Sequence, residues 1–129
     1  MLRQLVIAIV TLLVSATAEA QVTEVQACAS PSASPTLEAY DQLVVGARFS
    51  VVMRFDATSR RWVPEQQLRM PFHHASALEL VGFTMPAGHE HDRVRLEIRG
   101  REIVRQPPRD GTWFVTYRVD VLSACVVPR

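Results

Sequence analysis

The chain has 129 residues, with 14 basic and 13 acidic side chains and a formal net charge of +1 at pH 7. This balance excludes a protein that relies on net charge to bind nucleic acid or another polyanion. All the basic residues are arginine, which is typical of a GC-rich bacterial gene. The length suits one domain with a modest core.

The first twenty residues have the pattern of a secretory signal peptide. Arg3 gives the positive start, Leu5 to Val14 the apolar core, and Ala18-Glu19-Ala20 the cleavage site. The apolar run is about ten residues long, whereas a membrane-spanning helix needs about twenty. We therefore expect residues 1–20 to be removed, Gln21 to begin the mature protein, and no transmembrane segment to remain. The expected location is the bacterial periplasm or the outside of the cell.

The two cysteines, Cys28 and Cys125, lie near the two ends of the mature chain. In an oxidising compartment we expect them to form a structural disulfide. On the chain-entropy model, such a bond stabilises the fold by about 4–5 kcal/mol. Two alternatives stay open. The pair could be redox-active or bind copper, and Val25-Gln26-Ala27-Cys28 loosely resembles the site at which a lipoprotein is anchored.

The mature chain begins with a Pro- and Ser-rich segment, residues 21–42, which predicts an extended lead-in to a β-domain over residues 43–129. Apolar and polar residues alternate over Leu43–Asp56, which indicates a strand with one buried face. Met53 lies on that face and is interpreted as a core residue. Short edge strands are expected at 62–64 and 67–69, because Pro64 interrupts them, and a longer strand at 77–84.

Two further strands are expected at 92–104 and 112–122. Gly100 predicts a turn or bulge within the first, and residues 106–111 predict a loop rich in turn residues. In the last strand the large residues of one parity, from Trp113 to Val121, form the buried face. Without a helical apolar pattern after residue 20, the chain is predicted to be all-β, a two-sheet sandwich of Ig-like or cupredoxin-like shape.

The segment Met85-Pro86-Ala87-Gly88-His89-Glu90-His91 gathers one thioether and two imidazoles between two predicted strands. On an extended segment, His89 and His91 would point to the same face. Thioether and imidazole ligands suit copper, whereas magnesium and calcium prefer oxygen. Met85, His89 and His91 are therefore candidate copper ligands, with Glu90 as a group that could orient an imidazole. The alternative is a polar hairpin tip that carries two histidines.

A similar group, Met70-Pro71-Phe72-His73-His74, precedes the strand at 77–84. Met70, His73 and His74 are possible additional ligands. A straight strand would separate the two groups by about 30 Å, so one shared site requires a bend, for which Gly82 is the obvious place. The alternative for the two histidines is a pair on a surface loop.

The densest basic stretch follows the Met-His segment. It could dock onto an anionic surface such as lipid headgroups, or it could be a solvated sheet face balanced by Glu97 and Glu102. Its arginines, all of one parity, are the candidate basic surface: Arg93, Arg95, Arg99 and Arg101.

Three segments together resemble the YtkA-like family of small exported bacterial β-sandwiches: Gly46–Val52, Met85–His91 and Gly111–Val119. The closing segment is also similar to CopC-type copper carriers. The histidines come one position later after Met-Pro than in the YtkA-like pattern. The resemblance implies copper handling outside the cytoplasm, with Met85, His89 and His91 as ligands.

Two functions follow as expectations. One is an exported copper-binding protein that exchanges copper with a donor or acceptor protein. The other is a metal-free module that binds a protein or the envelope surface through its arginines or through Phe72. Since the sequence has no GxSxG, HExxH or Gly-rich phosphate-binding motif, we do not expect an enzyme.

Overall fold

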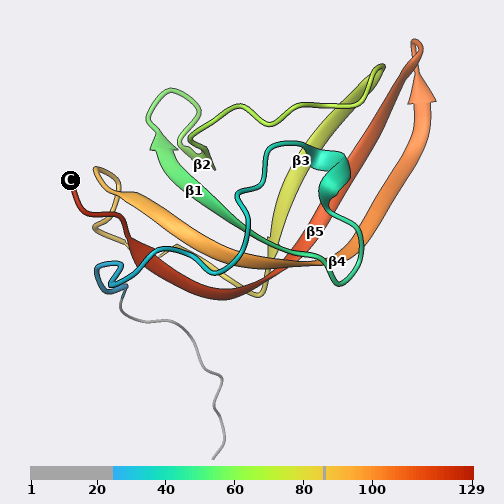
Figure 1. Ribbon diagram of the computed structural model, residues 1–129. Coiled ribbons are helices and arrows are strands. Elements are labelled where there is room, and N and C mark those ends of the chain that lie inside the picture. Colours follow the sequence, from blue (N-terminus) through green and yellow to red (C-terminus); the bar gives the residue numbers. More distant parts are fainter. Residues whose placement is uncertain (1–24, 86) are drawn as a thin grey trace, which may run out of the picture.

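The computed structural model describes residues 25–85 and 87–129 of the chain (Figure 1). The predicted signal peptide, Gln21 and Pro86 lie outside the described residues. The elements are a short 3-10 helix and five strands, in the order η1 (Tyr40–Gln42), β1 (Arg48–Asp56), β2 (Arg61–Pro64), β3 (His74–Val81), β4 (Arg93–Arg109) and β5 (Thr112–Val126). Among these elements, no helix has the length and apolar character that crossing a membrane requires.

The described strands form one mixed sheet with the order β2-β1-β4-β5-β3. All neighbours are antiparallel except β3 and β5, which are parallel. The long β4–β5 hairpin is the centre of the sheet. The first half of β4 pairs with β1, and the first half of β5 pairs with β3. The all-β prediction is confirmed, but the described strands belong to a single sheet where two sheets were expected.

An irregular layer, rather than a second sheet, covers the inner face of this sheet. The lead-in is attached to sheet edges by isolated bridges, Ala27 to Val126 and Thr36 to Ser50. Its prolines and serines prevent a regular ladder, yet its apolar residues still reach the core. The covering layer buries Leu37, Ala39, Tyr40, Leu43 and Leu68, and the sheet contributes Val51, Met53, Val94, Leu96, Ile98, Val115, Tyr117 and Val119. Met53 is thus a core residue, as predicted.

A disulfide joins Cys28 of the lead-in to Cys125 of β5. The two residues are 97 positions apart in sequence, and their Cα atoms are 4.9 Å apart. The predicted disulfide is confirmed. Neither thiol is free, so a copper-thiolate site has no sulfur to use while this bond is formed.

The β4–β5 hairpin is longer than predicted. β4 runs without interruption to Arg109, so the loop expected at 106–111 shrinks to a turn at Asp110 and Gly111, both with positive φ. Asp-Gly with positive φ at both positions is the preferred two-residue hairpin turn, because its twist matches that of the strands. The prolines of β4 are tolerated because β1 pairs with β4 only up to Arg99.

Gly100 marks the point where the hairpin leaves β1. Its N–H donates to the carbonyl of Ala47, and its carbonyl accepts from the N–H of Gly46, each at 2.8 Å. A Cβ atom at this position would lie 2.2 Å from the carbonyl oxygen of Val44. Gly100 therefore provides close contact between two backbone segments, and the register irregularity before Glu102 matches the bulge that was predicted here as the alternative to a turn. We call residues 101–118, beyond this contact, the arm.

Candidate functional site

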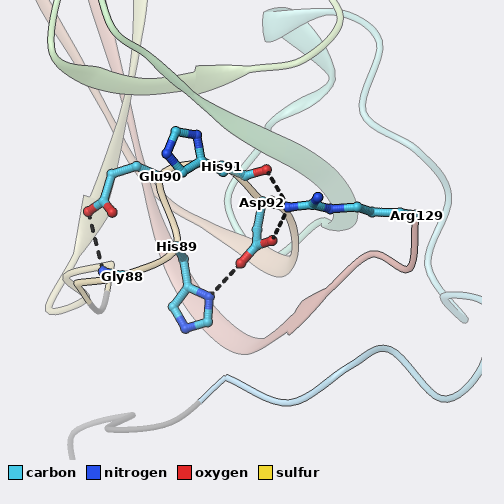
Figure 2. A network of polar contacts seen from close by, with 6 residues as sticks. All are labelled: Gly88, His89, Glu90, His91, Asp92 and Arg129. Atoms are coloured by element: carbon cyan, nitrogen blue, oxygen red, sulfur yellow. Dashed lines mark hydrogen bonds and ion pairs between the residues drawn. The ribbon is translucent and has the colours of Figure 1, made fainter.

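The Met-His segment lies in the connection between β3 and β4. Residues His89 to Asp92 form a turn, in which the N–H of Asp92 donates to the carbonyl of His89 at 3.0 Å. In a turn, residues two apart no longer share a face. Figure 2 shows the imidazoles of His89 and His91 pointing in opposite directions. The prediction that the two rings face the same way was therefore wrong, because it assumed an extended backbone.

His89 is held by a carboxylate. Its Nδ1 lies 2.9 Å from Oδ2 of Asp92, and both side chains are 24% exposed. This contact is the main cause that lowers the pKa of Asp92 below its usual value, and Arg129 adds to the effect. The guanidinium of Arg129 lies 3.4 Å from Oδ1 of Asp92 and 3.3 Å from the carbonyl of His91 (Figure 2). An imidazole that donates from Nδ1 to a carboxylate presents Nε2 outward, as histidine ligands of metals do.

The other predicted groups of this segment are differently placed. Met85 is half-buried and packs against the hydrophobic core. Glu90 turns back to the loop, where its carboxylate accepts from the N–H of Gly88 at 3.4 Å, so it does not orient an imidazole. Within residues 25–85 and 87–129, no three side chains among histidine, cysteine, aspartate and glutamate are grouped as a metal site. Asp92 was missed as the partner of His89 because the turn that brings them together has no strong sequence signal.

The second Met-His group lies at the opposite end of β3. His74 begins this strand, which has eight residues and ends at Val81, before the 82–92 connection. At about 3.3 Å per residue, the two ends of β3 are about 23 Å apart, so the two groups do not form one site. Gly82 has positive φ, but it lies beyond the end of the strand and cannot fold the strand back on itself.

The four arginines of the predicted basic surface each contact a carboxylate. Arg93 pairs with Glu65 and Arg95 with Glu97, while Arg99 and Arg101 both contact Asp120. The same face carries Arg118 between Glu79 and Glu102. This arrangement matches the alternative of a solvated sheet face whose charges are balanced. Docking onto an anionic surface through these arginines would require breaking the pairs.

Aromatic and basic side chains instead gather at the end of the arm. The side chain of Phe72 is 85% exposed and its ring lies 4.0 Å from that of His73. The backbone N–H of Trp113 donates to the carbonyl of His73 at 2.8 Å, and the Trp113 side chain is 42% exposed. Arg109 lies over the ring of Phe114 at 5.1 Å. We call these five residues the tip cluster. Phe72, in the turn before β3, and Trp113, on β5, were not predicted to lie at the same end of the sheet, because they are far apart in sequence.

A hollow lies between the lead-in and β1. It has a volume of about 250 Å³, an apolar floor that includes Leu37, Val51 and Leu68, and the Glu65–Arg93 pair at its rim. Ligand pockets commonly have volumes of about 300–1,000 Å³. Its lining contains no histidine, cysteine or serine, so we do not assign chemistry to it.

Residues 25–85 and 87–129 form an all-β domain with one mixed sheet, one disulfide and exposed aromatic residues at the end of the long hairpin. Comparison with protein-family models, curated proteins and solved structures gave no match.

Proposed function

We propose that this protein is an exported binding module that docks onto a partner protein through the tip cluster. The observation that supports this proposal is the exposure of Phe72 and Trp113 at the same end of the sheet, where the backbone N–H of Trp113 bonds to the carbonyl of His73, the residue after Phe72. Exposed aromatic residues that lie together are unusual on a surface without a partner, and tryptophan, tyrosine and arginine dominate the energetics of protein interfaces.

The construction of the arm also favours this role. Trp113 lies on β5, and Phe72 lies in the turn directly before β3, which pairs with β5 from His74 and Trp113 onward without a register shift. A surface held on paired strands loses little conformational freedom on binding. Export is supported by the predicted signal peptide and by the disulfide, which persists in oxidising compartments.

Site-specific photo-crosslinking in the producing bacterium tests this proposal. A photoreactive phenylalanine at position 72 should give a discrete adduct with one protein, identified by mass spectrometry. The same residue at position 45, where Val45 is 68% exposed at the root of the arm, is the matched control. Trp113→Ala should reduce the position-72 adduct. If both positions give the same adducts, or if Trp113→Ala has no effect, the tip cluster is not the binding surface.

A copper-binding role is the second candidate, and it is supported by one observation. Asp92 holds His89 in the orientation of a metal-ligating imidazole. Copper would be bound by His89 with Met85 or His91, as the resemblance to YtkA-like proteins implies, after the loop rearranges. The protein would then exchange copper with a donor or acceptor protein.

Copper titration separates the two candidates. The purified oxidised protein is titrated with Cu(I) under a competing chelator, and separately with Cu(II). One-to-one binding that is lost in His89→Ala, weakened in His91→Ala and kept in His73→Ala would support the copper role. Equal binding in all four proteins, or none in the unmodified protein, would contradict it.

A further inference from the structure

The outer edge of β3 is a strand edge with its hydrogen-bonding groups unused. β3 is the last strand of the sheet and pairs only with β5. Within the described residues, the backbone of residues 75–81 makes no hydrogen bond to any segment other than β5. Figure 1 shows β3 at the border of the sheet beside β5. Unpaired N–H and C=O groups in a row are a template for another strand.

The other exposed edges of the sheet carry devices that prevent such pairing. β2 has only four residues and ends in Pro64. The free part of β4 has two register irregularities, two prolines and three arginines, namely Pro107, Pro108, Arg101, Arg105 and Arg109. Short strands, prolines, charges and bulges are the features that keep edges from pairing. Of these features β3 has one charge, Glu79: it is eight residues long, contains no proline or arginine, and keeps an even register with β5.

The hydrogen bonds to β5 determine which residues of β3 face outward. The N–H of Trp113 donates to the carbonyl of His73. In a parallel ladder, alternate residues bond to the same neighbour. Residues 75, 77, 79 and 81 therefore bond to β5, and Ser76, Leu78 and Leu80 direct their N–H and C=O groups to the free edge. The N–H of His74 also points this way, but it already donates to the carbonyl of Pro71 at 3.1 Å.

We propose that this edge pairs with β3 of a second copy of the chain, antiparallel, with Leu78 on the two-fold axis. In this register Ser76 of each copy forms a hydrogen-bonded pair with Leu80 of the other, and none of the backbone groups used has another partner within the described residues. A shift by one position along the strand would centre the pair on Ala77 and require the N–H of His74, which is occupied. The inner faces of both sheets remain on the same side, because residues of equal parity pair.

Charge also permits this arrangement. Glu79, the one charged residue among residues 75–81, lies opposite Ala77 of the second copy, and Arg118 of its own chain contacts it at 3.3 Å. The two Glu79 side chains would lie directly opposite each other only in a different register, the one centred on Glu79. A second copy thus accounts for the open edge.

The test is sedimentation equilibrium of the purified, oxidised protein over micromolar to millimolar concentrations. We expect a reversible dimer. Ala77→Glu places a second carboxylate opposite Glu79 in a non-hydrogen-bonded pair, the type of antiparallel pair in which the side chains lie closest. The two-fold axis creates this repulsion twice, so the dimer dissociation constant should rise roughly 2- to 30-fold. Ala77→Lys, at the same exposed position, should lower it. Ala75→Glu adds the same charge opposite Val81 and should change it little.

Each outcome decides the proposal. Opposite effects of Ala77→Glu and Ala77→Lys on a wild-type dimer support the Leu78-centred pairing. A monomer at all concentrations overturns it, and leaves this edge to an extended segment of another protein. A dimer on which both Ala77 variants act alike, or on which Ala75→Glu acts more strongly than Ala77→Glu, also overturns it. Circular dichroism of each variant verifies that the monomer is folded. This inference does not depend on the proposed function of the tip cluster.

Discussion

Replacing Gly100 by alanine should destabilise the protein by about 2–4 kcal/mol. The added Cβ would lie 2.2 Å from the carbonyl oxygen of Val44, a contact with backbone that no side-chain rotation can relieve. Inserting a methyl group into a packed site typically costs about 1–3 kcal/mol. The two backbone hydrogen bonds between Gly100 and the 46–47 segment would lengthen as the strands separate, and each is worth about 1 kcal/mol.

Urea unfolding followed by tryptophan fluorescence measures this loss. The midpoint should fall while the slope stays constant, because the exposed area on unfolding is unchanged. Gln106→Ala, at an exposed position on the same strand, is the control and should stay within about 0.5 kcal/mol of the unmodified protein. If Gly100→Ala lowers the free energy of unfolding by less than about 0.5 kcal/mol, the backbone around Val44 moves aside at little cost. The contact then does not fix the root of the arm.

Two further predictions concern the ends of the domain and its loop. The double variant Cys28→Ser/Cys125→Ser should lose up to about 4–5 kcal/mol in urea unfolding, and the unmodified protein should lose the same amount in reductant; a loss in the variant alone would point to the serines rather than to the bond. Asp92 has a pKa lowered in the folded state, so its contribution to stability is present above its unfolded pKa and disappears as the pH falls through the folded value. Unfolding measured across the acid range should therefore depend less steeply on pH in Asp92→Asn, and an unchanged pH dependence would contradict this role.

Alternation in the sequence predicted strands well where one face is buried. In β1 and β5, Val51, Met53, Val115, Tyr117 and Val119 are all buried, as the pattern indicates. The same pattern misplaced Trp113, which shares their parity but is 42% exposed. Periodicity reports which face a residue is on, whereas burial also requires a covering layer, and η1 and the lead-in end short of the tip.

Partners in a sheet are less predictable than strands, because pairing joins residues far apart in sequence. Nothing local indicates that β3 pairs in parallel with β5, or that one sheet rather than two results. The geometry of the candidate metal site was hard to predict for a related reason. Its residues were identified, but the geometry of His89 and His91 depends on a turn closed by Asp92, and a turn with no proline or glycine at its centre resembles an extended segment in sequence.

The disulfide also determines how the domain responds to tension. With the Cα atoms of Cys28 and Cys125 4.9 Å apart, the chain enters and leaves the domain at almost one point. A pull on both termini is therefore carried by a covalent bond and bypasses the strand ladders. The hairpin end lies at the other side of the molecule (Figure 1). Along the fifteen residues of β5, at about 3.3 Å each, the reach from that anchorage is up to about 50 Å. A domain attached there would hold its aromatic end at up to that distance from the attachment point.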